Sequence, residues 1–150
     1  MTARLMQLIF LTFLAFSTHS AYAKDPISTG RFSNIAVSGY DPVAYFTQGA
    51  PVKGLKEFTY SYNGAEWRFA SADHLDRFKA EPTAYAPQYG GYCAWAISQD
   101  YIAPGNPKNW RIVDGALYLN YNDKVQDEWE KDIPGFIALA NGNWPTVLDK

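Results

Sequence analysis

The first regular pattern along the chain is an alternation of apolar and polar residues over residues 58–69, interrupted by Asn63-Gly64. An Asn-Gly dipeptide between two alternating runs is typical of a β-hairpin with a two-residue turn. That turn sets the register of the strands, so that one face is apolar and the other polar. The cross-strand pairs predicted in this way are Tyr60 with Trp67, Phe58 with Phe69, Thr59 with Arg68, and Ser61 with Glu66.

A similar alternation in residues 110–119, around Asp114-Gly115, predicts a second hairpin. Its apolar face is predicted to pair Trp110 with Leu119 and Ile112 with Leu117. On the opposite face, Arg111 and Tyr118 are expected to point to solvent and to stack as cation and ring. An exposed stack of this kind contributes about 0.5–1 kcal/mol.

Capping residues and apolar spacing predict short helices between and after these hairpins. One helix is expected from Ser71 to about Ala80, another after Asn122, and a last one after Asp132. Residues 43–46 are interpreted as a short apolar strand or turn. Together these elements predict a small single α+β domain in which two β-hairpins are interleaved with short helices.

The first 23 residues have the pattern of a cleaved secretory signal. Arg4 precedes an apolar run over residues 5–16, and Ala21-Tyr22-Ala23 fits a signal cleavage site. The run is too short to span a bilayer comfortably and no second one follows, so no membrane anchor is expected after cleavage. We therefore predict a periplasmic or secreted protein. Its expected parts are a signal peptide (1–23), a flexible arm (24–34), the domain (35–145) and a tail (146–150).

The charge balance narrows the range of partners. Arg4 lies in the signal segment, which leaves 12 basic and 15 acidic residues and a net charge of −3. Without a basic run, nucleic acid is not expected as a partner. A small ligand, a metal ion or an envelope protein remain as candidates. The chain has one cysteine and therefore no internal disulfide, so its 17% content of aromatic residues must supply much of the core.

Residues 85–96 contain that cysteine, Cys93, together with Gly90-Gly91, three tyrosines and a tryptophan. A short helix that is apolar nearly all round is expected after the glycines, and such helices are usually buried. Two interpretations stay open. Either this segment is the core helix of the domain, or the N-terminal end of the helix, next to the glycines, forms a binding site.

Several motifs resemble the YHS domain. They are Gly39-Tyr-Asp-Pro-Val-Ala-Tyr-Phe46, Tyr62-x-Gly64-x-x-Trp67-x-Phe69-Ala70-Ser71 and Phe78-x-x-x-Pro82-x-x-Tyr85. Residues 85–94 and 114–121 resemble the exported, stand-alone branch of that family, and the resemblance spans roughly residues 35–144. Metal-handling relatives carry three cysteines at the positions of Ala44, Ala70 and His74 here. The resemblance therefore implies the family scaffold without the usual zinc-knuckle site, which needs four ligands.

The candidate site residues each have two interpretations. Cys93 and His74 are candidate ligands for copper or zinc, and a helix start would lower the pKa of the Cys93 thiol. Alternatively, Cys93 is a small buried apolar residue and His74 a packing residue. Tyr89, Tyr92, Cys93, Tyr45 and Asp41 are candidate ligand-binding residues; otherwise the tyrosines belong to the aromatic core and Asp41 forms a turn.

Three functions are compatible with these observations. The leading hypothesis is an exported, non-enzymatic binding module for a small ligand or a metal ion. Its cleft would lie between the helix at residues 71–80 and the helix that contains Cys93. One alternative is a copper-handling protein that uses Cys93 with His74. The other is a thiol-dependent redox enzyme that uses Cys93.

Overall fold

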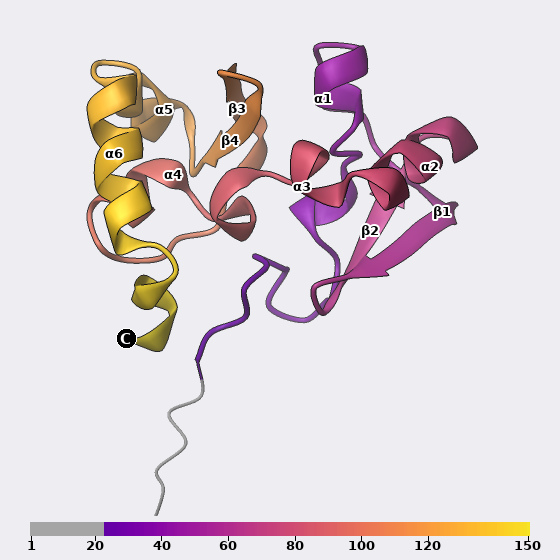
Figure 1. Ribbon diagram of the computed structural model, residues 1–150, viewed down its shortest axis with the longest axis horizontal. Coiled ribbons are helices and arrows are strands. Elements are labelled where there is room, and N and C mark those ends of the chain that lie inside the picture. Colours follow the sequence, from indigo (N-terminus) through magenta and orange to yellow (C-terminus); the bar gives the residue numbers. More distant parts are fainter. Residues whose placement is uncertain (1–22) are drawn as a thin grey trace, which may run out of the picture.

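The computed structural model describes residues 23–150, so nearly all of the predicted signal segment lies outside the described residues. The fold is a small α+β domain, as predicted (Figure 1). Its helices are α1 (Ala44–Thr47), α2 (Ala72–Ala80), α3 (Pro82–Tyr85), α4 (Ala94–Ser98), α5 (Asp123–Trp129) and α6 (Ile133–Asn143). Its strands are β1 (Leu55–Tyr62), β2 (Ala65–Phe69), β3 (Asn106–Val113) and β4 (Ala116–Asn120). Three 3-10 turns are η1 (Val37–Gly39), η2 (Gln88–Gly91) and η3 (Thr146–Asp149). None of the helices in residues 23–150 has the length and apolarity needed to cross a membrane.

The first hairpin has the predicted register near its turn and a different one at its open end. Tyr60 lies opposite Trp67, as expected from the Asn-Gly turn. Phe69, however, pairs with Leu55 rather than with Phe58, because β1 contains an irregularity between Leu55 and Thr59. A turn determines the pairing only as far as the ladder stays regular, and a bulge in one strand changes the partners beyond it.

The second hairpin has the predicted pairs but not the predicted outer face. Tyr118 is only 7% exposed and packs against Trp129 of α5, with 5.6 Å between the ring centroids. Arg111 forms an ion pair with Glu130 instead of a stack with Tyr118. The expectation of an outward cation–ring pair was wrong, because α5 covers the face of β4 that the alternation left to solvent.

Strand β4 separates two hydrophobic cores that share a single domain. Leu117 and Leu119 point to the first core and Tyr118 points to the second. The first core lies in the half with α1, α2 and the β1–β2 hairpin, and the second lies in the half with α4, α5 and α6 (Figure 1). The largest fully buried side chains of the first core include Trp67, Phe69 and Phe78, and Trp129 belongs to the second.

Side-chain caps explain three of the six α-helix starts. Ser71, Asn122 and Asp132 each accept a hydrogen bond from a backbone N–H of the helix that follows, as the sequence predicted. Residues 44–47 form α1 rather than a strand or a simple turn. The reason is that the Asp41 carboxylate accepts hydrogen bonds from the first backbone N–H groups of this segment.

Both ends of the described chain are bound to the domain. In the segment expected as an arm, the Lys24 N–H donates to the Leu148 carbonyl at 2.9 Å and the Ser28 N–H donates to the Gly90 carbonyl at 2.8 Å. Ile27 is buried in the first core. In the segment expected as a tail, Val147 and Leu148 are buried in the second core. These contacts bring the two termini of the described chain together beside η2.

Candidate functional site

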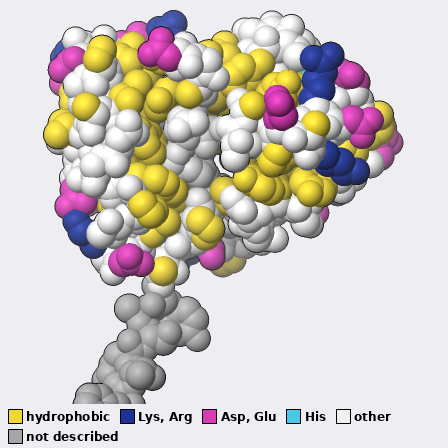
Figure 2. All heavy atoms as spheres, viewed as in Figure 1, with side chains coloured by type: hydrophobic (Ala, Val, Ile, Leu, Met, Phe, Trp, Pro, Cys, Tyr) yellow, Lys and Arg dark blue, Asp and Glu magenta, His cyan; other side chains and the backbone are white. Residues whose placement is uncertain are grey.

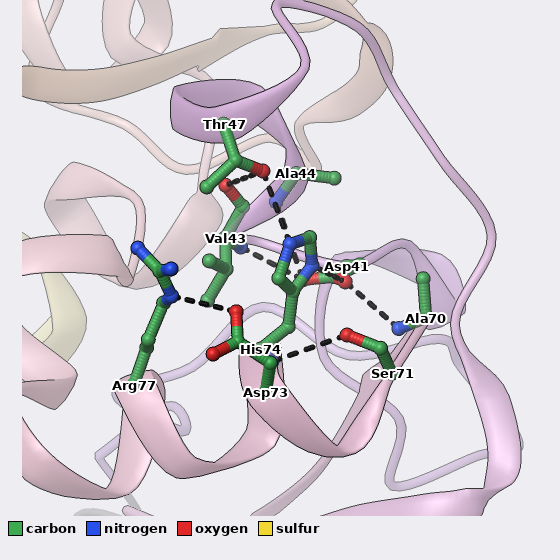
Figure 3. A network of polar contacts seen from close by, with 9 residues as sticks. All are labelled: Asp41, Val43, Ala44, Thr47, Ala70, Ser71, Asp73, His74 and Arg77. Atoms are coloured by element: carbon green, nitrogen blue, oxygen red, sulfur yellow. Dashed lines mark hydrogen bonds and ion pairs between the residues drawn. The ribbon is translucent and has the colours of Figure 1, made fainter.

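The Asp41 carboxylate is the centre of a buried polar network (Figure 3). Asp41 is fully buried, and its Oδ1 accepts hydrogen bonds from the backbone N–H groups of Val43 at 2.8 Å and Ala44 at 3.3 Å. Its Oδ2 accepts from the Ala70 N–H at 2.8 Å and lies 2.6 Å from Nδ1 of His74. Asp41 therefore ties the start of α1, the end of β2 and helix α2 to one carboxylate.

His74 uses both of its ring nitrogens within this network. Because the ionised carboxylate of Asp41 can only accept, Nδ1 carries the proton in that contact. On the other side, Nε2 lies 3.1 Å from Oγ1 of Thr47, which is also within 3.3 Å of the Val43 carbonyl. The Thr47 hydroxyl has a single proton, so it donates either to Nε2 or to that carbonyl. The arrangement holds the imidazole in one orientation and couples it to the first turn of α1.

Cys93 is a buried residue at the N-cap of α4. It is 1% exposed, and its Sγ lies 3.6 Å from the side-chain oxygen of Asn120. Burial raises the pKa of the Cys93 thiol, and this effect outweighs the opposing backbone N–H groups of Ala96, Tyr121 and Trp95. The expectation of a lowered pKa was therefore wrong, because α4 has only five residues and the sulfur is shielded from water.

Native Cys93 is expected to react slowly with iodoacetamide between pH 7 and pH 9. Because the thiol is buried and its pKa is raised, alkylation requires local opening, and we expect a rate at least about 100-fold below that of the urea-unfolded protein. The rates can be measured by mass spectrometry, with the Cys93→Ser variant as the blank. Equal rates in the native and unfolded protein would show that the thiol is accessible.

The three candidate tyrosines have separate surroundings. The Tyr45 hydroxyl donates to the Pro107 carbonyl at 2.7 Å, and the Tyr92 hydroxyl donates to the Asp25 carbonyl at 2.8 Å. The Tyr89 hydroxyl donates to the side-chain oxygen of Asn141 at 2.8 Å. Burial raises the pKa of each of these phenols. All three therefore act as neutral donors that hold chain segments together.

The largest cavity described lies where the two halves meet the N-terminal segment. It has a volume of about 470 Å³, which is within the range of small-molecule sites. It is lined by Pro26, Ile27, Tyr62, Asn63, Thr83, Ala86, Pro87, Gln88, Tyr89, Gly90, Trp144, Pro145 and Leu148, and we call it the junction cleft. The two halves and the hollow between them are visible in Figure 2, with apolar side chains on both sides.

Of the predicted ligand-binding residues, only Tyr89 lines the junction cleft. Tyr92 lines a separate cavity of about 380 Å³, and Cys93 lines a small apolar one of about 220 Å³. Asp41 and Tyr45 line none of these three cavities. The five predicted residues therefore do not share one cavity.

Comparison with known proteins agrees with the motifs. The family model of the YHS domain matches residues 43–89. The chain contains a YHS domain. No curated protein and no solved structure matches the chain.

The YHS domain lies in the half of the molecule that contains the first core. It contains α1, the first hairpin, α2 and α3, and it ends at Tyr89 in η2. The cleft wall formed by residues 62–63 and 83–89 belongs to this domain. The facing wall comes from Trp144, Pro145 and Leu148, and the N-terminal segment contributes Pro26 and Ile27. The junction cleft is thus the place where the YHS domain meets the rest of the chain.

The YHS domain of this chain does not provide the donor set of a tetrahedral metal site. Among residues 23–150, no three His, Cys, Asp or Glu side chains are grouped so that they could hold a metal ion. His74 contacts Asp41 and Thr47, whereas Cys93 contacts Asn120. Helices α2 and α4 also lie in different halves (Figure 1), and none of the four cavities found in residues 23–150 is lined by residues of both helices.

Sequence reasoning missed most of the junction cleft. Asn63 was interpreted only as a turn residue, which describes its local role correctly, and Trp144, which follows α6, was not singled out. No local signal indicates that these two residues, 81 positions apart, border one cavity. The sequence Tyr89-Gly90-Gly91 is a local feature that could have pointed to the cleft. Its two glycines allow an unusual backbone, and in the structure all three residues have positive φ.

Proposed function

We propose that this protein is an exported, non-enzymatic binding module that holds a small uncharged ligand in the junction cleft. The observation that supports this most strongly is the position and composition of the cleft. It lies where the two halves meet, and its lining contains aromatic, amide and hydroxyl side chains but no charged one. Small-molecule sites are commonly placed between structural units and are lined by apolar groups with a few polar ones.

The other two hypotheses have less support from the geometry. Copper handling through Cys93 and His74 would need the two side chains at one site, and their polar partners differ. A redox enzyme would need a thiolate that substrates can reach, and burial both shields Cys93 and raises its pKa. The Asp41–His74–Thr47 network lines none of the three cavities above, which favours a structural role for it.

The proposal can be tested with a panel of uncharged fragments, observed by saturation-transfer NMR against the protein of residues 24–150. We expect a subset of fragments to bind and to lose their signal in the Thr83→Trp variant, in which the new indole fills the cleft. Thr83 is exposed and lines the cleft, whereas the control Thr59→Trp places the same side chain on the outer face of β1. Fragment signals that persist in Thr83→Trp, or the lack of any bound fragment, would contradict the proposal.

Export is part of the same proposal and has a separate test. The full-length chain can be expressed in a bacterial host, and the mature protein recovered from the cell envelope or the medium. We expect its N-terminus at Lys24, because Ala21-Tyr22-Ala23 fits the specificity of signal cleavage. Intact protein that remains in the cytoplasm would contradict export without affecting the binding proposal.

A further inference from the structure

We infer that the ligand of the junction cleft is a neutral polyhydroxylated molecule, that is, a mono- or disaccharide or the end of a longer glycan. This inference rests on the proposed function, and it specifies the chemical class of the ligand. It is based on three properties of the cleft: polar side chains that face solvent, an aromatic side chain in the same lining, and the lack of charged side chains.

The polar wall comes from the YHS domain and consists of Tyr62, Asn63, Thr83 and Gln88. Within residues 23–150, the hydroxyl groups of Tyr62 and Thr83 make no hydrogen bond to a protein group, and neither do the side-chain amides of Asn63 and Gln88. In contrast, the Tyr89 hydroxyl beside them is already bonded to Asn141. Hydroxyl and amide groups both donate and accept hydrogen bonds. They therefore match a ligand whose own hydroxyls do the same.

The C-terminal part of the chain contributes Trp144, Pro145 and Leu148 to the lining, and Trp144 has the largest side chain of the three. Its ring is half-buried and is held between Tyr89 and Tyr92, with centroid distances of 5.9 Å and 6.2 Å. The partly exposed indole thus provides a rigid apolar surface with little rotamer freedom left to lose on binding. A sugar ring has an apolar C–H face and a polar hydroxyl edge, so it can contact both walls at once.

The lack of charged side chains in the cleft argues against charged ligands, and its polar side chains argue against purely apolar ones. None of the residues that line the cleft is Asp, Glu, Lys, Arg or His. A phosphate, carboxylate or ammonium group would lose hydration in the cleft without an ionic partner, which is unfavourable. A purely apolar ligand would leave the four polar side chains of the opposite wall without partners and would lose affinity for that reason.

The inference can be tested with a panel of neutral mono- and disaccharides that includes glucose, N-acetylglucosamine and maltose. Glucose 6-phosphate serves as the charged comparator and 1-naphthol as the flat apolar one. Affinities are measured by saturation-transfer NMR and calorimetry on the protein of residues 24–150. We expect at least one neutral sugar to bind more tightly than either comparator.

Isosteric variants identify the groups that the sugar uses. Thr83→Val and Gln88→Leu keep the size of the side chain and remove its polar atoms, and we expect each to weaken sugar binding by roughly three- to tenfold. The matched control Thr59→Val, on the outer face of β1, should leave the affinity unchanged.

The outcomes separate this inference from the proposed function. If 1-naphthol or other fragments bind in the cleft and no neutral sugar does, the ligand class is wrong and the binding proposal stands. Tighter binding of glucose 6-phosphate than of its neutral parent would also overturn the class. Sugar binding that is insensitive to Thr83→Val and Gln88→Leu would place the sugar elsewhere. If nothing binds in the cleft, the proposed function itself fails.

Discussion

Replacement of Asp41 by alanine is expected to lower the free energy of unfolding by about 3–5 kcal/mol. The carboxylate is fully buried and accepts contacts from Val43, Ala44, Ala70 and His74. Truncation leaves several of these donors buried without a partner, and each such group costs roughly 1–3 kcal/mol. Since domains of this size are stable by only about 5–15 kcal/mol, the loss should be obvious in a urea denaturation curve.

The matched control is Asp73→Ala in α2. Asp73 is exposed and pairs with Arg77 four residues later, so its removal should cost at most about 1 kcal/mol. The Asp41→Asn variant should be intermediate, because an amide can accept from α1 but places a donor next to the Ala70 N–H. If Asp41→Ala were no less stable than Asp73→Ala, the carboxylate would not connect α1, β2 and α2 as proposed.

Replacement of Gly90 by alanine is expected to displace the N-terminal segment and to lower the free energy of unfolding by roughly 2–4 kcal/mol. A Cβ at this position would lie 1.8 Å from the Pro26 carbonyl oxygen and 2.9 Å from the Pro26 carbonyl carbon. Because these atoms are backbone, the segment must move away as a whole. The movement breaks the Ser28–Gly90 hydrogen bond and exposes part of Ile27.

Gly49→Ala provides a closely matched control for this prediction. Both glycines have φ of +63°, but a Cβ on Gly49 would meet nothing within 4 Å. Its substitution should therefore cost only the left-handed backbone preference, about 1–2 kcal/mol. Hydrogen exchange of residues 24–28 distinguishes the two variants, since only Gly90→Ala should expose these amides. Equal stability and equal exchange in both variants would show that the contact between Gly90 and Pro26 is not tight.

The N-terminal segment that Gly90 contacts also borders the cleft. Pro26 and Ile27 line the junction cleft on one side and a second cavity of about 320 Å³ on the other. The segment therefore acts as the wall between the two cavities. A protein that begins after the signal segment retains this wall, whereas one that begins beyond Ile27 would lack it.

Local features of the sequence were enough to predict both hairpins and the starts of three helices, although α1 and α3 were not predicted. The Asn63-Gly64 and Asp114-Gly115 turns predicted both hairpins, and the caps at Ser71, Asn122 and Asp132 predicted three helix starts. These predictions were confirmed because turns and caps depend on contacts between residues at most a few positions apart. The YHS motifs predicted the domain matched at residues 43–89 for the same kind of reason, since each motif is a short local segment.

The predictions that were wrong depended on distant segments. The irregularity in β1 changed the partner of Phe69, and the packing of α5 buried the face of β4 that contains Tyr118. The pKa of Cys93 is raised rather than lowered because α4 is buried, which the helix start alone could not reveal. For β4 the periodicity identified the two faces of the strand correctly, but it did not show that α5 covers the second face.

What the sequence determined by itself is therefore the two hairpins with their turns, the three helices that begin at side-chain caps, and the YHS identity of residues 43–89. The tertiary structure alone decided which residues meet. It paired Asp41 with His74 across 33 positions, separated His74 from Cys93, and placed Trp144 opposite the first hairpin turn across the junction cleft. The physical reason is that turns and caps form within a few residues of the chain. A cleft forms only where two cores fail to close on each other, and that depends on how all of the elements pack together.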